Sequence, residues 1–254
     1  MDTAILSRIL STYAPNSAGS QDQLIASSLE ALDAIPGLLS VFADRERIFE
    51  TSIDEFSRHV PADVVEEFGE VFLANGSDKS TLHDYHKLYA TLLHRSRHHV
   101  RRIVEIGIGT NDPHILSTMG VQGKPGASLR AFESLLAESE IIGADIDEKI
   151  LFQSGRIRCV SCDQTRAYGF DALREALAGR SADLLIDDGL HAVHANLHTL
   201  LFGLDVVAPG GHVVIEDIPH HFGWFWKALA GLLQRRHGCT LVRCRSALAF
   251  VVRT

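Results

Sequence analysis

Apolar side chains follow two different patterns along the chain. In the first 75 residues they recur at intervals of three and four, most clearly over residues 5–10, 24–32 and 64–73. This spacing places them on one face of an α-helix. A further group, from Phe42 to Phe56, predicts another helix, and Asn75-Gly76 ends the last one. No strand pattern is visible here, so we expect residues 1–76 to form a helical accessory segment. Such a segment can cover the active site, make oligomer contacts or serve only as a structural cap.

Beyond residue 100, short apolar runs alternate with helical stretches. The predicted strands cover residues 102–106, 141–145, 157–162, 182–186, 212–215, 240–245 and 247–252. The predicted helices cover residues 128–138, 171–177, 192–206 and 224–236. This alternation is typical of a mostly parallel sheet with helices on both faces. The last two strands follow each other around Ser246, which predicts an antiparallel hairpin. We therefore expect an α/β fold with a seven-stranded sheet, in a domain spanning residues 77–254.

Composition narrows the class of protein. Hydrophobic residues make up 46% of the 254 residues, which permits a sizeable core, and the formal net charge is −8. The most basic stretch, residues 95–102, is typical of a solvated helix end, so no nucleic-acid partner is expected. No apolar run reaches membrane-spanning length and no signal-peptide pattern is visible. The four cysteines are expected to be reduced thiols, so we expect a cytoplasmic protein without a membrane partner.

A glycine-rich turn follows the first predicted strand of the α/β region. The strand ends at Glu105-Ile106, and Gly107 and Gly109 come next. Glycine adopts positive φ readily and lets a ligand approach the backbone closely. Asp112 stands where a dinucleotide-binding G-x-G-x-x-G turn has its third glycine, which disfavours a pyrophosphate. The acidic Glu105 suits a cationic, amino-acid-like ligand instead.

Further polar residues follow the second and third predicted strands. Asp145 ends the second strand, where a carboxylate can accept hydrogen bonds from both hydroxyls of a ribose. Asp163 and Gln164 follow the third strand, where a side chain could bind an adenine amino group. For Asp163, a helix cap or turn residue is an equally good interpretation.

Acidic pairs end the fourth and fifth predicted strands. These pairs are Asp187-Asp188 and Glu216-Asp217. Adjacent parallel strands bring such ends together, where carboxylates repel one another unless a cation is present. Carboxylate oxygens suit a hard divalent ion such as Mg²⁺, although some of these residues could instead cap helices or form salt bridges. His191 follows Asp188 by three residues and is a candidate general base.

These motifs resemble those of known enzymes. Residues 105–109, 143–145, 183–188 and 209–211 resemble the core of class I S-adenosylmethionine-dependent methyltransferases, which have a Rossmann-like sheet. More narrowly, the D-D-G-x-H run at 187–191 and the P-G-G-x-x-x-x-E-D run at 209–217 resemble metal-dependent sugar O-methyltransferases of macrolide pathways, including the mycinamicin and macrocin enzymes. Residues 77–79 and 83–85 resemble this family's segment leading into the catalytic domain, which helps enclose cofactor and substrate.

The resemblance implies an O-methyltransferase that uses S-adenosylmethionine and Mg²⁺. Asp188, Glu216 and Asp217 would ligate the metal, and His191, beside Asp188, would deprotonate a sugar hydroxyl of a glycosylated natural product. The implied cofactor-binding residues are Glu105, Gly107, Gly109, Asp145, Asp163, Gln164 and Asp187.

Other interpretations stay open at this point. The same machinery would serve a catechol-like or other vicinal diol acceptor. A catalytically silent member of the fold whose N-terminal helices mediate assembly is a second alternative, and a nicotinamide oxidoreductase is a third, disfavoured by Asp112. The partners expected are a small-molecule substrate and further copies of the chain in a homo-oligomer. Trp224, Phe225 and Trp226 are expected either to pack a helix on the sheet or to form an apolar wall for an aglycone, and His83 and Tyr85 could line the acceptor pocket.

Overall fold

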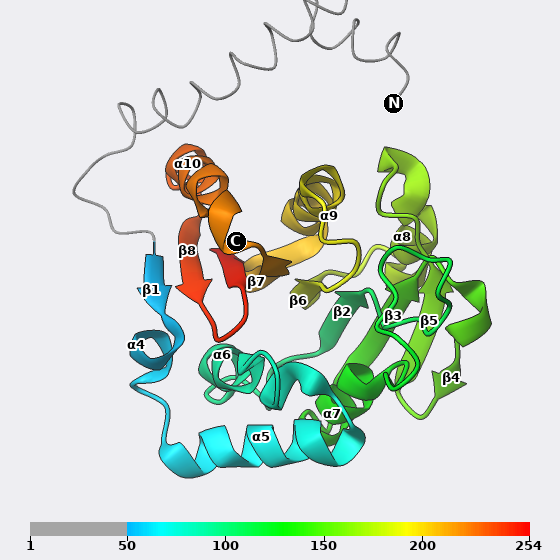
Figure 1. Cartoon of the computed structure of the whole chain (residues 1–254), viewed down its shortest axis with the longest axis horizontal. Coiled ribbons are helices and arrows are strands. Elements are labelled where there is room, and N and C mark those ends of the chain that lie inside the picture. Colours follow the sequence, from blue (N-terminus) through cyan, green and yellow to red (C-terminus); the bar gives the residue numbers. More distant parts are fainter. Residues whose placement is uncertain (1–49) are drawn as a thin grey trace, which may run out of the picture. The chain divides into compact units, whose positions relative to one another are not determined.

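A single mixed sheet organises the part of the chain that the structure describes. The structure is a computed structural model that describes residues 50–254, so the helices predicted over residues 5–10 and 24–32 lie outside the described residues. Within this range, nine strands form one sheet in the order β1-β8-β9-β7-β6-β2-β3-β5-β4 (Figure 1). The strands are β1 (Glu50–Ser52), β2 (Arg102–Ile106), β3 (Glu140–Asp145), β4 (Gln153–Ser154), β5 (Ile157–Ser161), β6 (Ala182–Asp187), β7 (Val207–Ile218), β8 (Gly238–Arg243) and β9 (Leu248–Arg253).

Helices cover both faces of this sheet. The α-helices of the described range are α4 (Ile53–Ser57), α5 (Ala62–Asn75), α6 (Tyr85–Leu93), α7 (Ala127–Leu135), α8 (Asp171–Leu177), α9 (Val193–Val206) and α10 (Gly223–Leu233). Short 3-10 turns are η1 (Asp78–Ser80), η2 (Glu148–Ile150), η3 (Ala167–Phe170) and η4 (His220–Phe222). Helices α4 to α7 lie on one face, and α8, α9 and α10 lie on the other (Figure 1).

Alternation of side chains along the central strands builds the two cores. Ile141 of β3 faces the α5–α7 layer, whereas its neighbour Ile142 faces the α8–α10 layer. Val213 and Val214 of β7 divide in the same way. Successive residues of a strand point to opposite faces, so a strand between two helical layers is apolar throughout. This explains why the central strands read as continuous apolar runs.

The α/β fold and the C-terminal antiparallel hairpin are confirmed. Strands β7, β6, β2, β3 and β5 are parallel, and β8 and β9 pair antiparallel. The predicted number of seven strands is wrong, because β1 and β4 extend the sheet at its edges. These strands of three and two residues are held by pairing with β8 and β5, so periodicity within the chain gives no sign of them.

Two predictions on the N-terminal side have different outcomes. The helix predicted from Phe42 to Phe56 is wrong at residues 50–52, because β1 pairs in parallel with β8 there. Helix α4 begins only at Ile53, where the Ser52 side chain accepts a hydrogen bond from the Glu55 amide. The helix predicted over residues 64–73 is confirmed as α5, and Gly76 ends it at a φ of 83°.

Helix α5 belongs to the core of the described unit. Phe72 is fully buried, and its ring packs edge-on against Phe132 of α7 at 5.3 Å between centroids and lies 6.1 Å from Tyr89 of α6. Aromatic contacts of this kind tie α5 to the helices on the sheet. The division expected between residues 76 and 77 concerns mainly residues outside the described range and stays a prediction.

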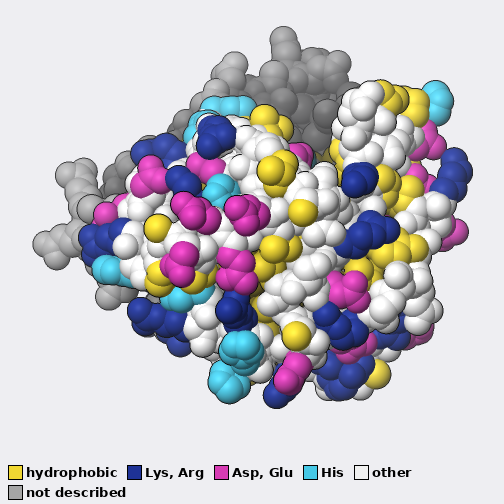
Figure 2. All heavy atoms as spheres, turned by 90° about the horizontal axis from the view of Figure 1, so that it is seen from below, with side chains coloured by type: hydrophobic (Ala, Val, Ile, Leu, Met, Phe, Trp, Pro, Cys, Tyr) yellow, Lys and Arg dark blue, Asp and Glu magenta, His cyan; other side chains and the backbone are white. Residues whose placement is uncertain are grey.

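Surface and cysteine features bear on the expected partners. Lys, Arg, Asp and Glu side chains are interspersed on the face shown in Figure 2. Within residues 50–254, no helix is long and apolar enough to cross a membrane. Cys159 and Cys162 are spaced as C-x-x-C, yet they are free thiols that pack into the cores on opposite faces of the sheet. This spacing therefore forms neither a disulfide nor a thiol pair here.

The sheet topology gives one preferred place for a ligand. From β2 the chain proceeds to β3 and β5 on one side, and later to β6 and β7 on the other. Ligands of open α/β sheets bind outside the carboxyl ends of the strands where this direction reverses, here between β2 and β6. The glycine turn follows β2 and the Asp187-Asp188 pair ends β6, so both lie at this point.

Candidate active site

The turn after β2 is shaped by two glycines with positive φ. Gly107 has a φ of 85° and Gly109 a φ of 86°. A Cβ atom on Gly107 would lie 2.1 Å from the backbone oxygen of Asp188, which is far inside van der Waals contact. Gly107 therefore lets the turn after β2 touch the turn after β6, while the expected close approach of a ligand stays a prediction.

Replacing Gly107 with alanine is expected to disrupt this contact. Gly210 is a matched control, because its φ is also 85° but a Cβ there meets nothing within 4 Å. Gly210→Ala should lower the free energy of unfolding by about 1–2 kcal/mol, the cost of a left-handed conformation. Gly107→Ala should lower the free energy of unfolding by more than this, measured by urea denaturation. Equal losses in the two variants would contradict the importance of the contact.

A cavity of about 270 Å³ opens beside this turn. Gly107, Asp145, Asp163, Gln164 and Leu190 are among the residues that line it. The Asp145 carboxylate accepts hydrogen bonds from the amides of Ile108, at 2.9 Å, and Asp147, at 3.0 Å. These bonds aim the carboxylate at the cavity and leave further lone pairs for a ligand.

The remaining predicted cofactor residues have several environments. The Asp163 carboxylate accepts the Thr165 amide at 3.1 Å, so Asp163 is also the turn residue of the alternative interpretation. Gln164 lines the cavity but donates to Asp187 at 3.0 Å. Asp187 is fully buried, also accepts from Asn196, and is not among the residues that line either of the two cavities described. Through these hydrogen bonds Asp187 fixes the end of β6 to Gln164 and Asn196.

A larger cavity of about 530 Å³ lies on the other side of the glycine turn. Its lining includes Asp188, His191, Glu216 and Asp217. Successive residues of a regular strand point to opposite faces, so Glu216 and Asp217 would normally diverge. The pairing of β7 with β9 is irregular between Ile215 and Ile218, and Asp217 has a positive φ of 53°. This bulge turns both carboxylates toward the same cavity.

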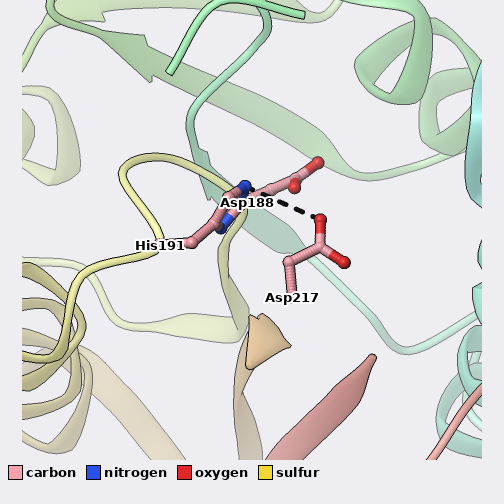
Figure 3. Close-up of side chains that lie close together, drawn as sticks. All are labelled: Asp188, His191 and Asp217. Carbon is pink, nitrogen blue, oxygen red and sulfur yellow. Dashed lines mark ion pairs between the residues drawn. The ribbon is translucent and has the colours of Figure 1, made fainter. Parts of the chain in front are cut away.

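Asp188, His191 and Asp217 come close together at this cavity. One potential ligand atom from each of the three lies within 4.8 Å of the others. The His191 Nε2 atom is 3.6 Å from the Asp217 Oδ2 atom, as marked in Figure 3. The His191 side chain is 37% exposed, so it remains accessible from the cavity. Glu216 lies outside this group of three.

Glu216 and Glu105 are instead gathered around a buried lysine. The Lys79 Nζ atom lies 2.6 Å from the Asp188 Oδ2 atom and 3.4 Å from the Glu105 Oε1 atom, and it also pairs with Glu216. The Tyr89 hydroxyl donates a second hydrogen bond to Glu216. Burial, opposed by Lys79 and by the Ser128 hydroxyl, raises the pKa of Glu105 to about 7. Glu105 therefore faces Lys79 within the protein and lines neither of the two cavities.

Asp217 is held as a carboxylate by its neighbours. The Tyr85 hydroxyl donates to its Oδ1 atom at 2.8 Å and accepts its amide at 3.0 Å, while His83 lies 3.1 Å from the same oxygen. Burial works to raise the pKa of Asp217, but His83, His191 and Tyr85 together lower the pKa to about 2. Asp217 is therefore ionised throughout the neutral range and presents a negative charge to the cavity.

The sequence analysis did not place Lys79 and Tyr89 in the site. Both belong to residues 77–89, which precede the first central strand and carry no strand-end signal. The available signal was the resemblance of residues 77–79 and 83–85 to a segment that encloses the site. His83 and Tyr85, considered as pocket residues, do line the larger cavity.

Comparisons with known proteins point to one group of enzymes. No family model matches the chain. The chain is 29% identical over 160 residues to an 8-demethyl-8-alpha-L-rhamnosyl tetracenomycin-C 2'-O-methyltransferase of Streptomyces olivaceus, covering 63% of this chain and 39% of that protein. It is 32% identical over 135 residues to the mycinamicin VI 2''-O-methyltransferase of Micromonospora griseorubida, covering 51% and 29%. The chain thus spans well under half the length of these relatives.

Comparison with solved structures shows which fold the chain has. The methyltransferase MycE of the mycinamycin biosynthetic pathway, in complex with Mg and SAH, superposes with a TM-score of 0.60 at 24% identity, over 74% of this chain and 54% of that one. A complex that also contains mycinamycin VI gives a TM-score of 0.61 at 23% identity, over 74% and 53%. The chain has the class I methyltransferase fold. The resemblance seen in the sequence motifs of the Rossmann-like core is thereby confirmed.

Proposed function

We propose that the protein is an S-adenosylmethionine- and Mg²⁺-dependent O-methyltransferase that methylates a sugar hydroxyl of a glycosylated natural product. The observation that carries this proposal is the convergence of Asp188, His191 and Asp217 at one cavity, directly beside the glycine turn after β2. The sequence relatives are sugar O-methyltransferases, which supports the acceptor class.

The two cavities suit the two ends of S-adenosylmethionine. Asp145, at the end of β3, would accept hydrogen bonds from the ribose hydroxyls in the smaller cavity, with Asp163 and Gln164 near the base. Gly107 lines both cavities, so the cofactor would cross from one to the other over this residue. Glu105 and Asp187 line neither cavity, so their roles would be indirect. Glu105 would position Lys79, and Asp187 would position Gln164.

The donor set fits a divalent cation. Asp188 and Asp217 offer hard oxygen ligands, and Glu216 lies at the same cavity. Asp217 is ionised, and Asp188 and Glu216 lie at the same cavity with one lysine between them, so the site would attract a further cation. Asp188, Glu216 and Asp217 would hold Mg²⁺, whose charge makes a nearby hydroxyl easier to ionise.

The side chains around the cavity account for the chemistry. S-adenosylmethionine supplies an electrophilic methyl group bonded to a sulfonium. His191, exposed at the cavity, would accept the proton of the acceptor hydroxyl. Asp217 would orient His191 and stabilise the imidazolium that forms, because its Oδ2 atom lies 3.6 Å from Nε2. Asp217 is itself fixed by Tyr85 and His83.

The expected homo-oligomer and the cytoplasmic location stay predictions. So does the apolar wall for an aglycone: Trp226 is buried in the core against Phe250, while Trp224 is partly exposed. Trp226 thus packs helix α10 on the sheet, Phe225 packs partly buried against the same core, and Trp224 remains a candidate for a surface role.

Binding and transfer assays test the proposal together. Calorimetry should show binding of S-adenosylhomocysteine and no binding of NAD. With S-adenosylmethionine and MgCl₂, methyl transfer should occur to a rhamnosylated tetracenomycin or to mycinamicin VI and not to the corresponding aglycones, measured by mass spectrometry. Transfer to catechol but to no glycoside would show that the acceptor class is wrong. Failure to bind S-adenosylhomocysteine would reject the methyltransferase itself.

A further inference from the structure

Lys79 is a buried cation at the centre of the acidic cluster. Its side chain is only 2% exposed, and it comes from η1, ahead of helix α6. Its three carboxylate neighbours follow or end three different strands, with Glu105 in β2, Asp188 after β6 and Glu216 in β7. These three carboxylates surround the lysine side chain and compensate for the loss of water around it. Lysine is almost never buried unless it is paired in this way.

The ammonium bridges two of the residues proposed to hold the divalent cation. Its Nζ atom is 2.6 Å from Asp188 and in direct ion-pair contact with Glu216. A lysine that uses these oxygens competes with any metal ion for them. Two cations also repel each other at such distances, most strongly away from water. Both oxygens of Glu216 already accept hydrogen bonds, one from Lys79 and one from Tyr89, so a divalent ion that uses Glu216 would compete with Lys79 for it.

An alternative acceptor for Lys79 lies within reach. The Glu105 Oε1 atom is 3.4 Å from Nζ, and it is buried without a hydrogen-bond partner. The other oxygen of the same carboxylate accepts the Ser128 hydroxyl at 2.7 Å, which fixes its orientation. At present this oxygen has only the longer ion pair with Lys79, so a shift of Lys79 toward Glu105 would give it a full hydrogen bond while releasing the metal ligands.

We propose that Lys79 is a positioning residue that takes the place of the divalent cation in the metal-free protein and moves toward Glu105 when the cation binds. This inference rests on the proposed function, because it needs a cation at Asp188 and Glu216. In the metal-free state the lysine holds the acidic strand ends together, and it lowers the affinity of the site for the metal. Since Glu105 lies two residues before Gly107, cation binding would also change the charge balance next to the cofactor.

The variant Lys79→Met tests this role without any measurement of turnover. Magnesium chloride is titrated into the full chain by calorimetry, and thermal unfolding is followed with and without the metal. Lys79→Met is expected to bind Mg²⁺ at least about tenfold more tightly than the wild type, because the competing cation is gone. Without metal, the variant should have a lower melting temperature than the wild type. Saturating Mg²⁺ should raise the melting temperature of the variant by more than it raises that of the wild type. Lys87→Met is the matched control, because Lys87 pairs with the exposed Asp54 and with no other acidic side chain within residues 50–254, so its loss should leave the Mg²⁺ affinity unchanged.

A second variant tests the movement toward Glu105. Glu105→Gln removes the charge of the acceptor that Lys79 would approach. In the wild-type background it should weaken Mg²⁺ binding, whereas in the Lys79→Met background it should have a clearly smaller effect. If Glu105→Gln weakens Mg²⁺ binding equally in both backgrounds, Glu105 acts on the metal only through its charge. That result would overturn the proposed movement of Lys79 toward Glu105.

The outcomes separate this inference from the proposed function. If the wild type binds no Mg²⁺, the proposed metal site is wrong and the inference falls with it. If the wild type binds Mg²⁺ and Lys79→Met binds it no more tightly, only the inference is overturned. If the methionine variant folds only when Mg²⁺ is added, that result supports the role of the lysine. If it does not fold at all, Lys79→Gln, which keeps two N–H donors without the charge, should show the same gain in affinity.

Discussion

Replacing Asp188 with asparagine is expected to reduce methyl transfer more than about 100-fold. Loss of a residue that only orients a metal ligand lowers metal affinity or activity about 10–100-fold, so loss of a ligand itself should have a larger effect. Asp188 follows β6, lies in the group with His191 and Asp217, and pairs with Lys79. The substitution keeps the shape of the side chain but removes the negative charge that Asp188 offers to the cation. Mg²⁺ binding measured by calorimetry should weaken in parallel.

Metal removal and a surface control complete this test. EDTA should stop methyl transfer by the wild type, and excess MgCl₂ should restore it. Asp205→Asn alters an exposed aspartate that pairs with Arg174, and should leave both metal binding and transfer unchanged. Persistence of full activity in EDTA and in Asp188→Asn would show that the reaction proceeds without the metal.

The second large effect is expected for His191→Ala. A general base contributes roughly 10²–10⁴-fold to a rate, so turnover should fall by about this factor. The histidine lines the larger cavity, and it is not among the residues that line the smaller one, which we assign to the adenosine. Binding of S-adenosylhomocysteine should therefore remain nearly unchanged. Initial rates at saturating acceptor, together with calorimetry, measure the two quantities.

A neighbouring histidine provides the comparison for this variant. His194 is exposed in the first turn of α9, three residues after His191. His194→Ala should keep turnover within about twofold of the wild type, since a surface substitution away from the cavity has a small effect. Unchanged turnover in His191→Ala would exclude this residue as the base and would direct attention to His83, the other histidine that lines the cavity.

Some features of the site could be predicted from local patterns. Asp145, Asp188, Glu216 and Asp217 each stand at or just after the end of an apolar run, and parallel strands bring such ends to one edge. For this reason the cavity-lining carboxylates could be named from the sequence. The exceptions are Glu105 and Asp187. Both are buried behind the cavities and held by Ser128 and Gln164, and these contacts join positions 23 residues apart in the chain.

The amino-acid sequence by itself determined the order of the central strands and the helices between them, the glycine turn and the acidic strand ends, because each depends on residues adjacent in the chain. Tertiary structure alone decided which side chains meet. Lys79 reaches Glu216 across 137 positions of sequence, and pairing of β7 with β9 creates the bulge that turns Glu216 and Asp217 to the same side. Hydrogen bonds and ion pairs of this kind depend on distances in space, for which local periodicity holds no information.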